Sequence, residues 1–136
     1  MAQQVQSEIV QFLAIVKGMA PLRVLEIGTS RGGTLFLLCR HAHPSARVFS
    51  LDLPGGTGGS GYALYRIPLY KAFALPNQKL HLLRGDSHQE AMAATIKHML
   101  GNHQFDLLFI DGDHSYEGVR RDYDLYAPLV RQGGII

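Results

Sequence analysis

Residues 23–34 read Arg23-Val-Leu-Glu-Ile-Gly-Thr-Ser-Arg-Gly-Gly-Thr34, and this stretch decides the fold. Its first five residues form a short, largely apolar run typical of a β-strand, and Gly28 ends that run. From Gly33 onward the apolar residues recur at helical spacing. Glycine allows a sharp turn of the main chain and the close approach of a ligand to the backbone. The stretch therefore predicts a strand, a glycine turn and a helix whose free N–H groups face that turn.

The alternation of strand and helix continues along the rest of the chain. Helical spacing predicts helices at residues 3–17, 33–40, 65–74, 89–100 and 116–129. Apolar runs predict strands at residues 23–27, 46–51, 79–83 and 105–110. A fifth strand is expected to open at Ile135-Ile136, after Gly133-Gly134 has ended the last helix. Residues 54–61 contain five glycines and predict an irregular loop, either a flap over a site or a plain surface connection.

Strands and helices that alternate in this way fold as right-handed βαβ units. The expected fold is therefore α/β, with a Rossmann-like doubly wound parallel sheet in three α/β/α layers. The sheet should have about five strands and be incomplete at the C-terminus. We expect a single domain over residues 1–136 that includes the N-terminal helix.

The composition points away from nucleic acid and membrane partners. The net charge is only +2, and the chain has no block of like charges. No apolar stretch approaches the ~18–20 residues that span a bilayer. Cys39 is the single cysteine, so no disulfide forms within the chain, which fits a reducing compartment. These features predict a cytoplasmic protein with a small-molecule partner.

Ligands of open parallel sheets bind at the carboxyl ends of the strands, which all lie at one edge. Four sets of residues follow the predicted strands directly: residues 28–33, Asp52, Asp86-Ser87 and Asp111-Gly-Asp-His114. Three of the four sets carry a carboxylate. We therefore expect these sets to line one site.

The first glycine turn differs from the dinucleotide-binding fingerprint. That fingerprint, G-x-G-x-x-G, seats a pyrophosphate at a helix N-terminus, whereas this turn reads G-x-x-x-G-G. Glu26, next to last in the strand, would repel a pyrophosphate. Its carboxylate would suit a ligand with a cationic amino group, or an ordered water. The alternative is a tight connection that binds no ligand.

Asp52 ends the second strand, where a carboxylate can accept two hydrogen bonds from a ribose diol. A lone aspartate after a strand also serves as a turn residue or a helix cap. Because the glycine turn precedes it, we favour the ribose role. Asp86 and Ser87 fit two roles equally well, contact with a nucleobase or capping of the next helix.

Asp111-Gly-Asp-His114 is the candidate for chemistry, because it places two carboxylates and an imidazole in four residues. Hard divalent cations bind carboxylate oxygens, and histidine acts as a base near neutral pH. We expect Asp111 to be functional, and Asp113 and Ser115 to have a local capping role in the following helix.

Two stretches resemble a known family. Residues 24–34 resemble motif I of the class I S-adenosylmethionine-dependent methyltransferases. The stretch Phe109-Ile-Asp-Gly-Asp-His-Ser-Tyr-Glu-Gly-Val119 resembles the methyltransferase group related to the cephalosporin-hydroxylase-like proteins. Gly85-Asp-Ser-His88, Asp122, residues 125–129 and the final Gly133-Gly-Ile-Ile136 fit the same group. The resemblance runs from about Val24 to the last residue.

The resemblance implies a role for each matching position. The methionine part of S-adenosylmethionine would be held by Glu26, Gly28, Thr29, Ser30, Gly32 and Gly33. Asp52 would bind the ribose hydroxyls, and Asp86 and Ser87 would lie beside the adenine. Asp111 matches the position at which metal-dependent relatives hold a divalent cation, commonly Mg²⁺. His114 would be a base or a substrate contact.

The sequence also departs from the family that it resembles. Relatives continue past the Gly-Gly-Ile-Ile strand into a His-Asp pair and two further strands, so a metal site here would keep one protein carboxylate. We predict methyl transfer to an oxygen of a small molecule or sugar, with Asp111 and His114 as catalytic residues. One alternative is a truncated, non-catalytic fragment that binds cofactor and whose open sheet edge pairs with a second copy or a partner. The missing fingerprint lowers the other alternative, a NAD-dependent oxidoreductase.

Overall fold

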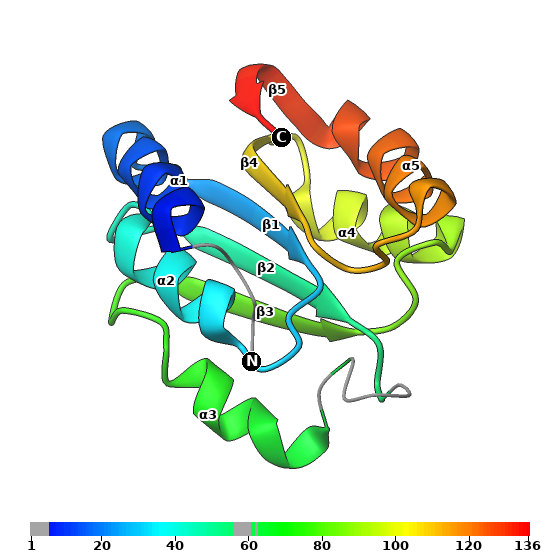
Figure 1. The fold of residues 1–136 in the computed structure, drawn as a ribbon, viewed down its shortest axis with the longest axis horizontal. Coiled ribbons are helices and arrows are strands. Elements are labelled where there is room, and N and C mark those ends of the chain that lie inside the picture. The colour runs from blue at the N-terminus through cyan, green and yellow to red at the C-terminus, as the bar shows by residue number, and fades with distance from the viewer. Residues whose placement is uncertain (1–5, 56–60, 62) are drawn as a thin grey trace.

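The computed structural model describes residues 6–55, 61 and 63–136. Its centre is a parallel sheet of five strands in the order β3-β2-β1-β4-β5, seen in Figure 1. The strands are β1 (Arg23–Ile27), β2 (Arg47–Asp52), β3 (Lys79–Arg84), β4 (Phe105–Ile110) and β5 (Val130–Ile135). The order steps outward from β1 in both directions, which makes the sheet doubly wound and confirms the predicted fold class.

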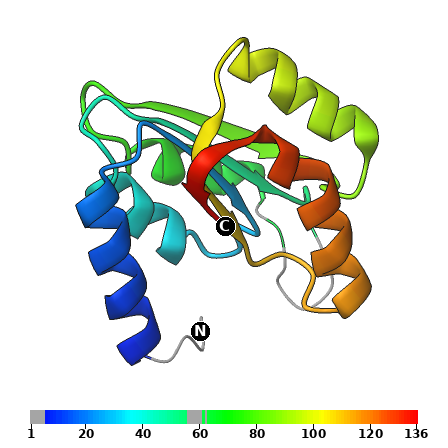
Figure 2. The ribbon, with the colours of Figure 1, turned by 90° about the horizontal axis from the view of Figure 1, so that it is seen from above.

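Helices cover both faces of the sheet and complete three layers (Figures 1 and 2). One face carries α1 (Gln6–Met19), α2 (Gly33–His41) and α3 (Ile67–Lys71). The other face carries α4 (Glu90–Leu100) and α5 (Tyr116–Tyr126). Two short 3₁₀ turns, η2 (Leu64–Arg66) and η3 (Ala127–Leu129), precede α3 and follow α5. Within the described residues, no helix combines the length and apolar character that a membrane span requires.

Side chains of each strand alternate between two separate apolar cores. On β1, Val24 packs toward α1 and α2, whereas Leu25 and Ile27 pack toward α4 and α5. Tyr70 and Tyr126 are fully buried, one in each core. Burying a large apolar side chain contributes roughly 1.5–3 kcal/mol, so these alternating positions hold the strand tips in place. Glu26 follows Val24 by two residues and therefore faces the same side of the sheet as α2.

Three predicted boundaries were wrong. The helix expected at residues 65–74 is a 3₁₀ turn followed by the short α3, and the helix expected to reach residue 129 ends at Tyr126. β5 begins at Val130, and Gly133-Gly134 lies inside it rather than before it. The glycines suit a register shift in the β4–β5 pairing. Gly133 has a φ of +75°, and a Cβ on Gly134 would lie 2.6 Å from Val130 Cγ1 and 3.0 Å from the Asp106 carbonyl oxygen.

Of the apolar residues whose spacing predicted α5, Tyr126 is buried, whereas several others are not. Tyr116, Val119 and Tyr123 are exposed, whereas Gly118, Asp122 and Tyr126 form the buried stripe. The buried residues are four apart, as one face of a helix requires. α5 therefore turns Tyr126, together with a glycine and an aspartate, toward the sheet and the neighbouring turns.

Candidate active site

A cavity of about 360 Å³ lies at the carboxyl ends of β1 to β4. Four of the predicted site residues line it: Gly28, Asp52, Asp86 and Ser87. The sequence-based expectation that separate strand tips meet in one place agrees with this geometry. The rest of the lining is Ile27, Leu51, Leu53, Gly85, His88, Gly112 and Asp113. A mostly apolar wall with a few polar groups is usual for a site that binds a small molecule.

The β1–α2 turn, residues 28–32, owes its glycines to close packing within the protein. Gly28 has a φ of +96°, and a Cβ on it would lie 2.2 Å from the Asp111 carbonyl oxygen. Gly32 has a φ of +79°, and a Cβ there would lie 2.6 Å from the Tyr70 ring. Gly33 has free space where its Cβ would be. The atoms that approach Gly28 and Gly32 most closely are therefore protein atoms, which refines the expectation that these glycines admit a ligand.

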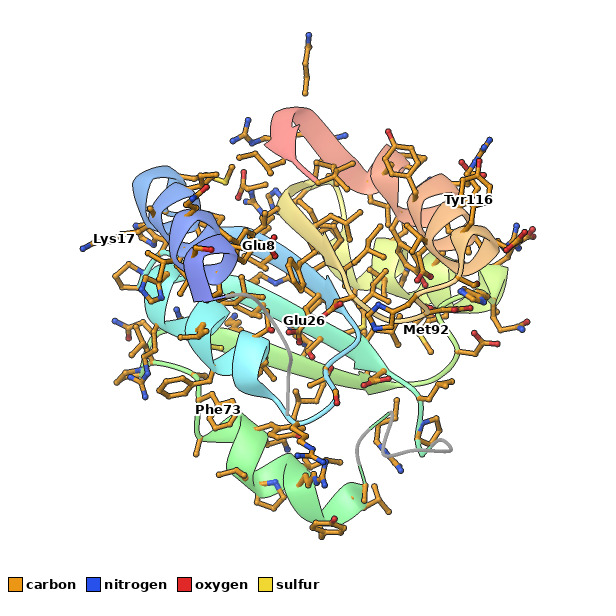
Figure 3. The ribbon with its side chains drawn as sticks, in the orientation of Figure 1. Glu8, Lys17, Glu26, Phe73, Met92 and Tyr116 are labelled. Carbon is orange, nitrogen blue, oxygen red and sulfur yellow. The ribbon has the colours of Figure 1, made fainter. Side chains whose placement is uncertain are left out.

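Glu26 lies inside the domain at the end of β1, as Figure 3 shows, and its side chain is fully buried. Ser50, its register partner on β2, donates a hydrogen bond of 2.7 Å to Oε2. The Ser50 and Thr29 hydroxyls are also hydrogen-bonded to each other. Burial, with Asp52 and Asp111 nearby, raises the pKa of Glu26 to about 8, although the hydroxyls of Ser50 and Thr29 oppose the shift. Its second oxygen, Oε1, has no hydrogen-bond partner among the described residues.

Asp52 joins the end of β2 to the β1–α2 turn. Its Oδ2 accepts a 2.6 Å hydrogen bond from the Ser30 N–H, and its Oδ1 accepts one of 2.8 Å from the Leu53 N–H. On the other side of the turn, the Tyr70 hydroxyl donates to the Ser30 carbonyl oxygen at 2.8 Å. Ser30 itself has a φ of +45°, which is unusual for a residue with a side chain. Asp52 and Tyr70 therefore fix the turn from two sides.

The β3–α4 turn, residues 85–89, does not use Asp86 or Ser87 as the helix cap. The N-cap of α4 is Gln89, so the capping alternative for these two residues was wrong. Asp86 instead accepts hydrogen bonds from the His88 N–H at 2.9 Å and from the Gln89 side-chain amide at 3.1 Å. These two bonds, the Gln89 one foremost, lower the pKa of Asp86 and keep it ionised. The carboxylate therefore holds the turn while its neighbours line the cavity.

The β4–α5 turn, residues 111–115, divides into two parts. Asp113 and Ser115 have the predicted local role: Asp113 accepts from the Ser115 N–H at 2.8 Å, and Ser115 caps α5 by accepting from the Gly118 N–H at 3.0 Å. His114 Nε2 lies 4.0 Å from Asp111 Oδ1, and the His114 side chain is 83% exposed. Neither Asp111 nor His114 lines the cavity, which reaches only to Gly112 and Asp113. The two catalytic candidates therefore lie beside the cavity rather than in its wall.

A metal site is not assembled around Asp111. Within the described residues, no group of three or more His, Cys, Asp or Glu side chains is placed to hold an ion. A divalent cation takes six or more oxygen ligands in proteins, or keeps several waters on one or two carboxylates. The described residues thus do not fit a metal ion by themselves.

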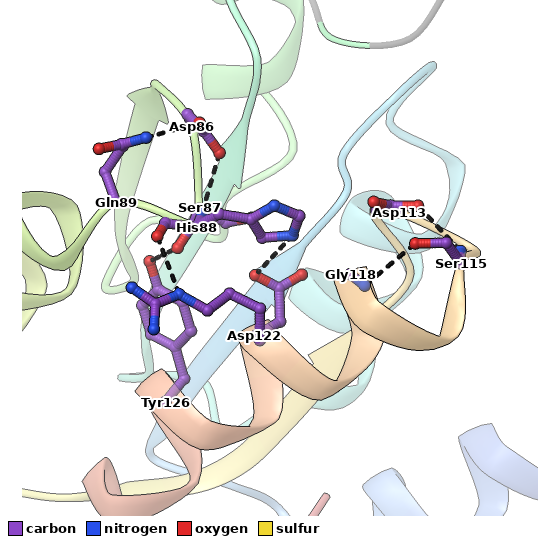
Figure 4. Close-up of polar contacts among 10 residues, drawn as sticks. Asp86, Ser87, His88, Gln89, Asp113, Ser115, Gly118, Asp122 and Tyr126 are labelled. Atoms are coloured by element: carbon purple, nitrogen blue, oxygen red, sulfur yellow. Dashed lines mark hydrogen bonds and ion pairs between the residues drawn. The ribbon is translucent and has the colours of Figure 1, made fainter.

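Sequence analysis did not assign a site role to His88 or Asp122. α5 contacts the β3–α4 turn in three places, shown in Figure 4. Tyr126 Oη donates to the Ser87 carbonyl oxygen at 2.8 Å, and Arg121 Nε donates to the His88 carbonyl oxygen at 3.2 Å. Asp122 Oδ1 lies 3.7 Å from His88 Nε2. One feature of the sequence could have identified Asp122. It lies four residues before Tyr126, so both side chains face the same side of the helix.

Asp122 is a fully buried carboxyl group. Neither oxygen makes a hydrogen bond of normal geometry within the described part of the chain. Burial raises its pKa, and the nearby Ser87 hydroxyl and His88 imidazole only partly offset that rise. Its Oδ2 lies under Gly112, where a Cβ would be 3.7 Å away. Asp122 therefore lies next to two residues that line the cavity, His88 and Gly112, but does not line the cavity itself.

Comparison with known proteins agrees with the fold. Residues 25–136 match the family described as "Methyltransferase domain". The chain belongs to this family, which confirms the resemblance to class I methyltransferases; the narrower resemblance to the cephalosporin-hydroxylase-like group stays a prediction. An uncharacterised protein of Acanthamoeba polyphaga mimivirus is 30% identical over 115 residues, covering 85% of this chain and 49% of the relative. The chain thus spans about half the length of the curated relative that it matches.

Solved structures show the same fold. An O-methyltransferase from Bacillus cereus, in complex with SAH, matches with a TM-score of 0.70 at 23% identity, over 99% of this chain and 57% of that one. The O-methyltransferase TomG from Streptomyces achromogenes, in complex with SAM, matches with a TM-score of 0.71 at 19% identity, over 97% and 55%. The methyltransferase MycE of the mycinamycin pathway, in complex with Mg and SAH, matches with a TM-score of 0.63 at 22% identity, over 93% and 30%.

Proposed function

We propose that this chain is the S-adenosylmethionine-binding part of a methyltransferase that transfers a methyl group to an oxygen of a small molecule. The observation that carries the proposal is the meeting of Gly28, Asp52, Asp86 and Ser87 in one cavity of about 360 Å³. The family match and the O-methyltransferases of the same fold support it. Small-ligand cavities of roughly 300–1,000 Å³ are the usual size range.

In this proposal, the parts of S-adenosylmethionine lie in a definite order along the strand tips. Asp52 lines it at the end of β2, where a carboxylate suits a ribose diol. The β3–α4 turn lies on the β3 side, next to Leu51 and Leu53, and suits a flat base between apolar and polar walls. The free Oε1 of Glu26, buried beneath the β1–α2 turn, suits a positive charge or an ordered water.

Glu26 gives the strongest test of that fit. A buried oxygen without a partner is costly, and a ligand that brings a cationic group or an ordered water removes that cost. Its raised pKa means that the folded chain holds a proton on Glu26 at neutral pH. A cationic amino group placed nearby would favour the ionised carboxylate and release that proton.

When bound, S-adenosylmethionine supplies a methyl group already activated on a sulfonium sulfur. The residues of this chain then have two tasks, to hold the acceptor in line and to remove its proton. In this proposal, His114 Nε2 takes the proton from the acceptor hydroxyl at the mouth of the cavity. Asp111, whose Oδ1 lies 4.0 Å from that nitrogen, stabilises the imidazolium that forms. No step is assigned to a metal ion, because the described residues do not fit one.

Calorimetry with S-adenosylhomocysteine tests the proposal on the 136-residue chain. We expect binding that raises the melting temperature and shifts the amide signals of residues 26–33 and 52. Asp52→Asn should weaken binding at least about tenfold, because one charge-assisted hydrogen bond to the diol is lost. Asp124→Asn, an exposed aspartate on α5, is the matched control. The proposal is wrong if saturating S-adenosylhomocysteine leaves both readouts unchanged, or if NAD binds in its place.

A methyl-transfer assay separates an enzyme from a chain that only binds cofactor. The protein would be incubated with methyl-labelled S-adenosylmethionine and a panel of small hydroxylated acceptors. Transfer that is lost in His114→Gln, while S-adenosylhomocysteine still binds, supports the base assigned here. Binding without transfer to any acceptor favours the non-catalytic alternative.

A further inference from the structure

Charged residues are distributed unevenly between the two edges of the sheet. Most of the 11 acidic residues lie around the cavity at the carboxyl edge or in the first turns of the helices beside it. The amino edge, where the strands begin and the preceding helices end, has the opposite character. Its connections contain no aspartate or glutamate; they are residues 20–22, 42–46, 72–78, 101–104 and 127–129. The loops of this edge therefore bring no negative charge to it.

Seven lysines and arginines lie at the amino edge. Three of them are the first residues of β1, β2 and β3, which are aligned in register: Arg23, Arg47 and Lys79. The last turns of α1, α2 and α4 supply three more, which are Lys17, Arg40 and Lys97. Figure 3 shows Lys17 on the side of the sheet where β1 and β2 begin, and Arg131 near the start of β5 is the seventh cation. Neighbouring strands are about 4.8 Å apart, so the three strand residues form a row of positive charges along the edge.

One of these seven cations is paired with an acid in the described part of the chain. Arg131 contacts Asp106 on β4, with 2.6 Å between Nε and Oδ1. Asp124, in the last turn of α5, is held by Arg120, with 2.9 Å between Oδ2 and Nε. The two acids of this part of the fold are therefore already neutralised by arginines. Among the described residues, the other six cations are left without an acidic partner.

Local structure accounts for part of this arrangement. Cations in the last turn of a helix stabilise it through the helix dipole, which suits the three helical residues. Arg47 Nη2 donates to the Met99 carbonyl oxygen near the end of α4 at 2.7 Å. Neither role applies to Arg23 and Lys79, whose side chains make no hydrogen bond or ion pair within the described residues. Like charges gathered in this way repel one another, and an anionic partner relieves that repulsion.

The connections of the amino edge are tied to one another. The His43 N–H donates to the Pro21 carbonyl oxygen at 3.1 Å. The side-chain amide of Gln78 donates to the carbonyl oxygens of His43 and Cys39 at 3.0 and 2.9 Å. The three connections before β1, β2 and β3 are therefore fixed relative to each other. A surface fixed in advance loses less conformational freedom when a partner binds.

We propose that the amino edge of the sheet is a docking surface for an acidic segment of a partner protein. The argument is charge complementarity: a fixed edge with six cations that lack an acidic partner among the described residues matches a segment rich in carboxylates. This surface goes beyond the proposed function and does not depend on it, because the cavity lies at the opposite ends of the strands. The cavity stays open while the partner is bound.

Other polyanions fit this edge less well. Single-stranded nucleic acid is bound by exposed aromatic side chains that stack on bases, and the connections named above expose none. A duplex is read by a helix or ribbon that enters a groove, whereas this edge consists of strand starts and short connections. A membrane surface requires large apolar side chains that insert, and within these connections Leu22, 43% exposed, is the one such residue.

A titration with an acidic peptide tests this surface on the 136-residue chain. The probe is a peptide of alternating glutamate and glycine, and binding is followed at neutral pH by calorimetry and by amide signals. We expect binding at about 0.05 M salt that weakens at least tenfold, roughly, at about 0.3 M salt, because salt screens exposed charges. The amide signals of residues 20–23, 41–47, 77–79 and 97–104 should shift, and those of residues 28–32 and 52 should stay unchanged.

Two double variants of equal net charge separate the amino edge from the charge of the whole chain. Lys79→Gln with Lys97→Gln removes two exposed cations of this edge. Arg31→Gln with Arg66→Gln removes two cations that lie near the carboxyl edge, so both proteins have a net charge of zero in place of +2. The first should bind the peptide about fivefold more weakly than the wild type, the effect of two exposed ion pairs, and the second should stay within about twofold. Melting temperatures check that both variants are folded.

Each outcome decides for or against the docking surface. A loss confined to Lys79→Gln with Lys97→Gln supports it, and that variant should bind S-adenosylhomocysteine as the wild type does. Equal losses in both double variants would show that the peptide follows net charge alone, and no binding at the lower salt would show that the edge attracts no acidic segment; either result overturns the proposal.

Three further measurements cover the other occupants. A duplex oligonucleotide that binds more tightly than the peptide would reassign the edge to nucleic acid. A phosphatidylcholine vesicle containing phosphatidylserine that does so would reassign it to membranes. Salt-dependent self-association without peptide would assign the edge to the acidic edge of a second copy. Each of these three results overturns the proposal.

Discussion

Ser50 on β2 donates a 2.7 Å hydrogen bond to Oε2 of Glu26, its register partner on β1. The bond satisfies one oxygen of a fully buried carboxyl group and leaves the other, Oε1, without a partner among the described residues. Burial raises the pKa of Glu26 from 4.5 to about 8 although the Ser50 hydrogen bond opposes the shift, so the carboxyl group is largely protonated at neutral pH. The protonated Glu26 thus lies directly beneath the β1–α2 turn, which we assign to the methionine part of the cofactor.

The first prediction concerns the pH dependence of stability. In the unfolded chain Glu26 loses its proton near pH 4.5, whereas in the folded chain it keeps the proton up to about pH 8. Between these values the folded state binds more protons, so the contribution of Glu26 to the free energy of unfolding falls as pH rises through this window. Chemical denaturation of the wild type and Glu26→Gln at pH 5, 6.5 and 8 measures it. The difference between the two proteins should change steadily across the window in favour of the variant.

Glu8→Gln provides the matched control, because Glu8 is an exposed glutamate on α1. It should track the wild type at all three pH values. A Glu26→Gln curve that runs parallel to the wild type would contradict the buried, protonated state. The absolute stability of the variant is a weaker readout, since a buried amide N–H₂ without a partner costs about 1–3 kcal/mol.

The second prediction compares two glycines of the same segment. A Cβ on Gly28 would lie 2.2 Å from the Asp111 carbonyl oxygen, whereas a Cβ on Gly33 meets nothing within 4 Å. Gly28→Ala should therefore destabilise the protein by more than about 3 kcal/mol or prevent folding, because backbone atoms of two strand ends must separate. Gly33→Ala should be neutral or stabilise α2 by up to about 1 kcal/mol. Urea denaturation distinguishes the two, and equal effects would show that the contact between β1 and β4 is not as described.

The third prediction concerns the attachment of β5. Asp106 on β4 accepts hydrogen bonds from the Leu22 and Arg23 N–H groups at 2.8 and 2.9 Å and from Arg131 Nε at 2.6 Å. Asp106→Ala leaves these donors without their acceptor and should cost about 2–4 kcal/mol, since one of them is charged. Arg131→Ala removes only the link to β5 and should cost less, about 1 kcal/mol. Amide exchange should show faster exchange in β5 for both variants and in residues 22–23 only for Asp106→Ala.

The fourth prediction tests the support of the β1–α2 turn by α3. The Tyr70 hydroxyl donates to the Ser30 carbonyl oxygen at 2.8 Å, and Ser30 in turn donates its N–H to Asp52. Tyr70→Phe should lower stability by about 0.5–1.5 kcal/mol and weaken S-adenosylhomocysteine binding several-fold, because Ser30 is held less firmly. Tyr123→Phe, at an exposed tyrosine on α5, should change neither quantity. An unchanged affinity in Tyr70→Phe would place the turn outside the binding site.

The two variants of the β1–α2 turn, Tyr70→Phe and Asp52→Asn, also form a double-mutant cycle. Both residues hold Ser30, one through its carbonyl oxygen and the other through its N–H. Residues that act on one group are coupled, so the part of the Asp52 loss that acts through Ser30 should not add to the Tyr70 loss, whereas the part due to the diol contact should add in full. Simple additivity would indicate that Asp52 contributes to binding without acting through the turn.

Several features of the fold followed from the sequence through local physics. The apolar runs at residues 23–27 and 105–110 gave the bounds of β1 and β4, because a strand buried on both faces is apolar along its length. The meeting of Gly28, Asp52, Asp86 and Ser87 in one cavity agrees with what parallel strands require, since their carboxyl ends share one edge. The local role of Asp113 and Ser115 also followed from residue type and position.

Other features depend on contacts between residues far apart in the chain. The sequence placed a break at Gly133-Gly134, but a strand passes through these glycines: Gly133 has a φ of +75°, and Val130 and Asp106 leave no space for a side chain at Gly134. It also pointed to the tyrosines of α5 as the sign of a packed helix, whereas the helix buries Tyr126 with Gly118 and Asp122 and leaves Tyr116 and Tyr123 exposed. Periodicity reports that a helix has a preferred face, and only the neighbouring turns decide which face that is.

The sequence alone determined the class of fold and the set of strand ends that carry polar residues, because both follow from periodicity and from the geometry of βαβ units. Tertiary structure decided which of those residues share a cavity, why Gly28 must be glycine, and which side chains stand behind the wall. His88 and Asp122 are 34 residues apart, and their contact arises only when α5 packs against the β3–α4 turn. The physical reason is that burial and pairing of a charge are properties of the assembled layers, which no local stretch of residues contains.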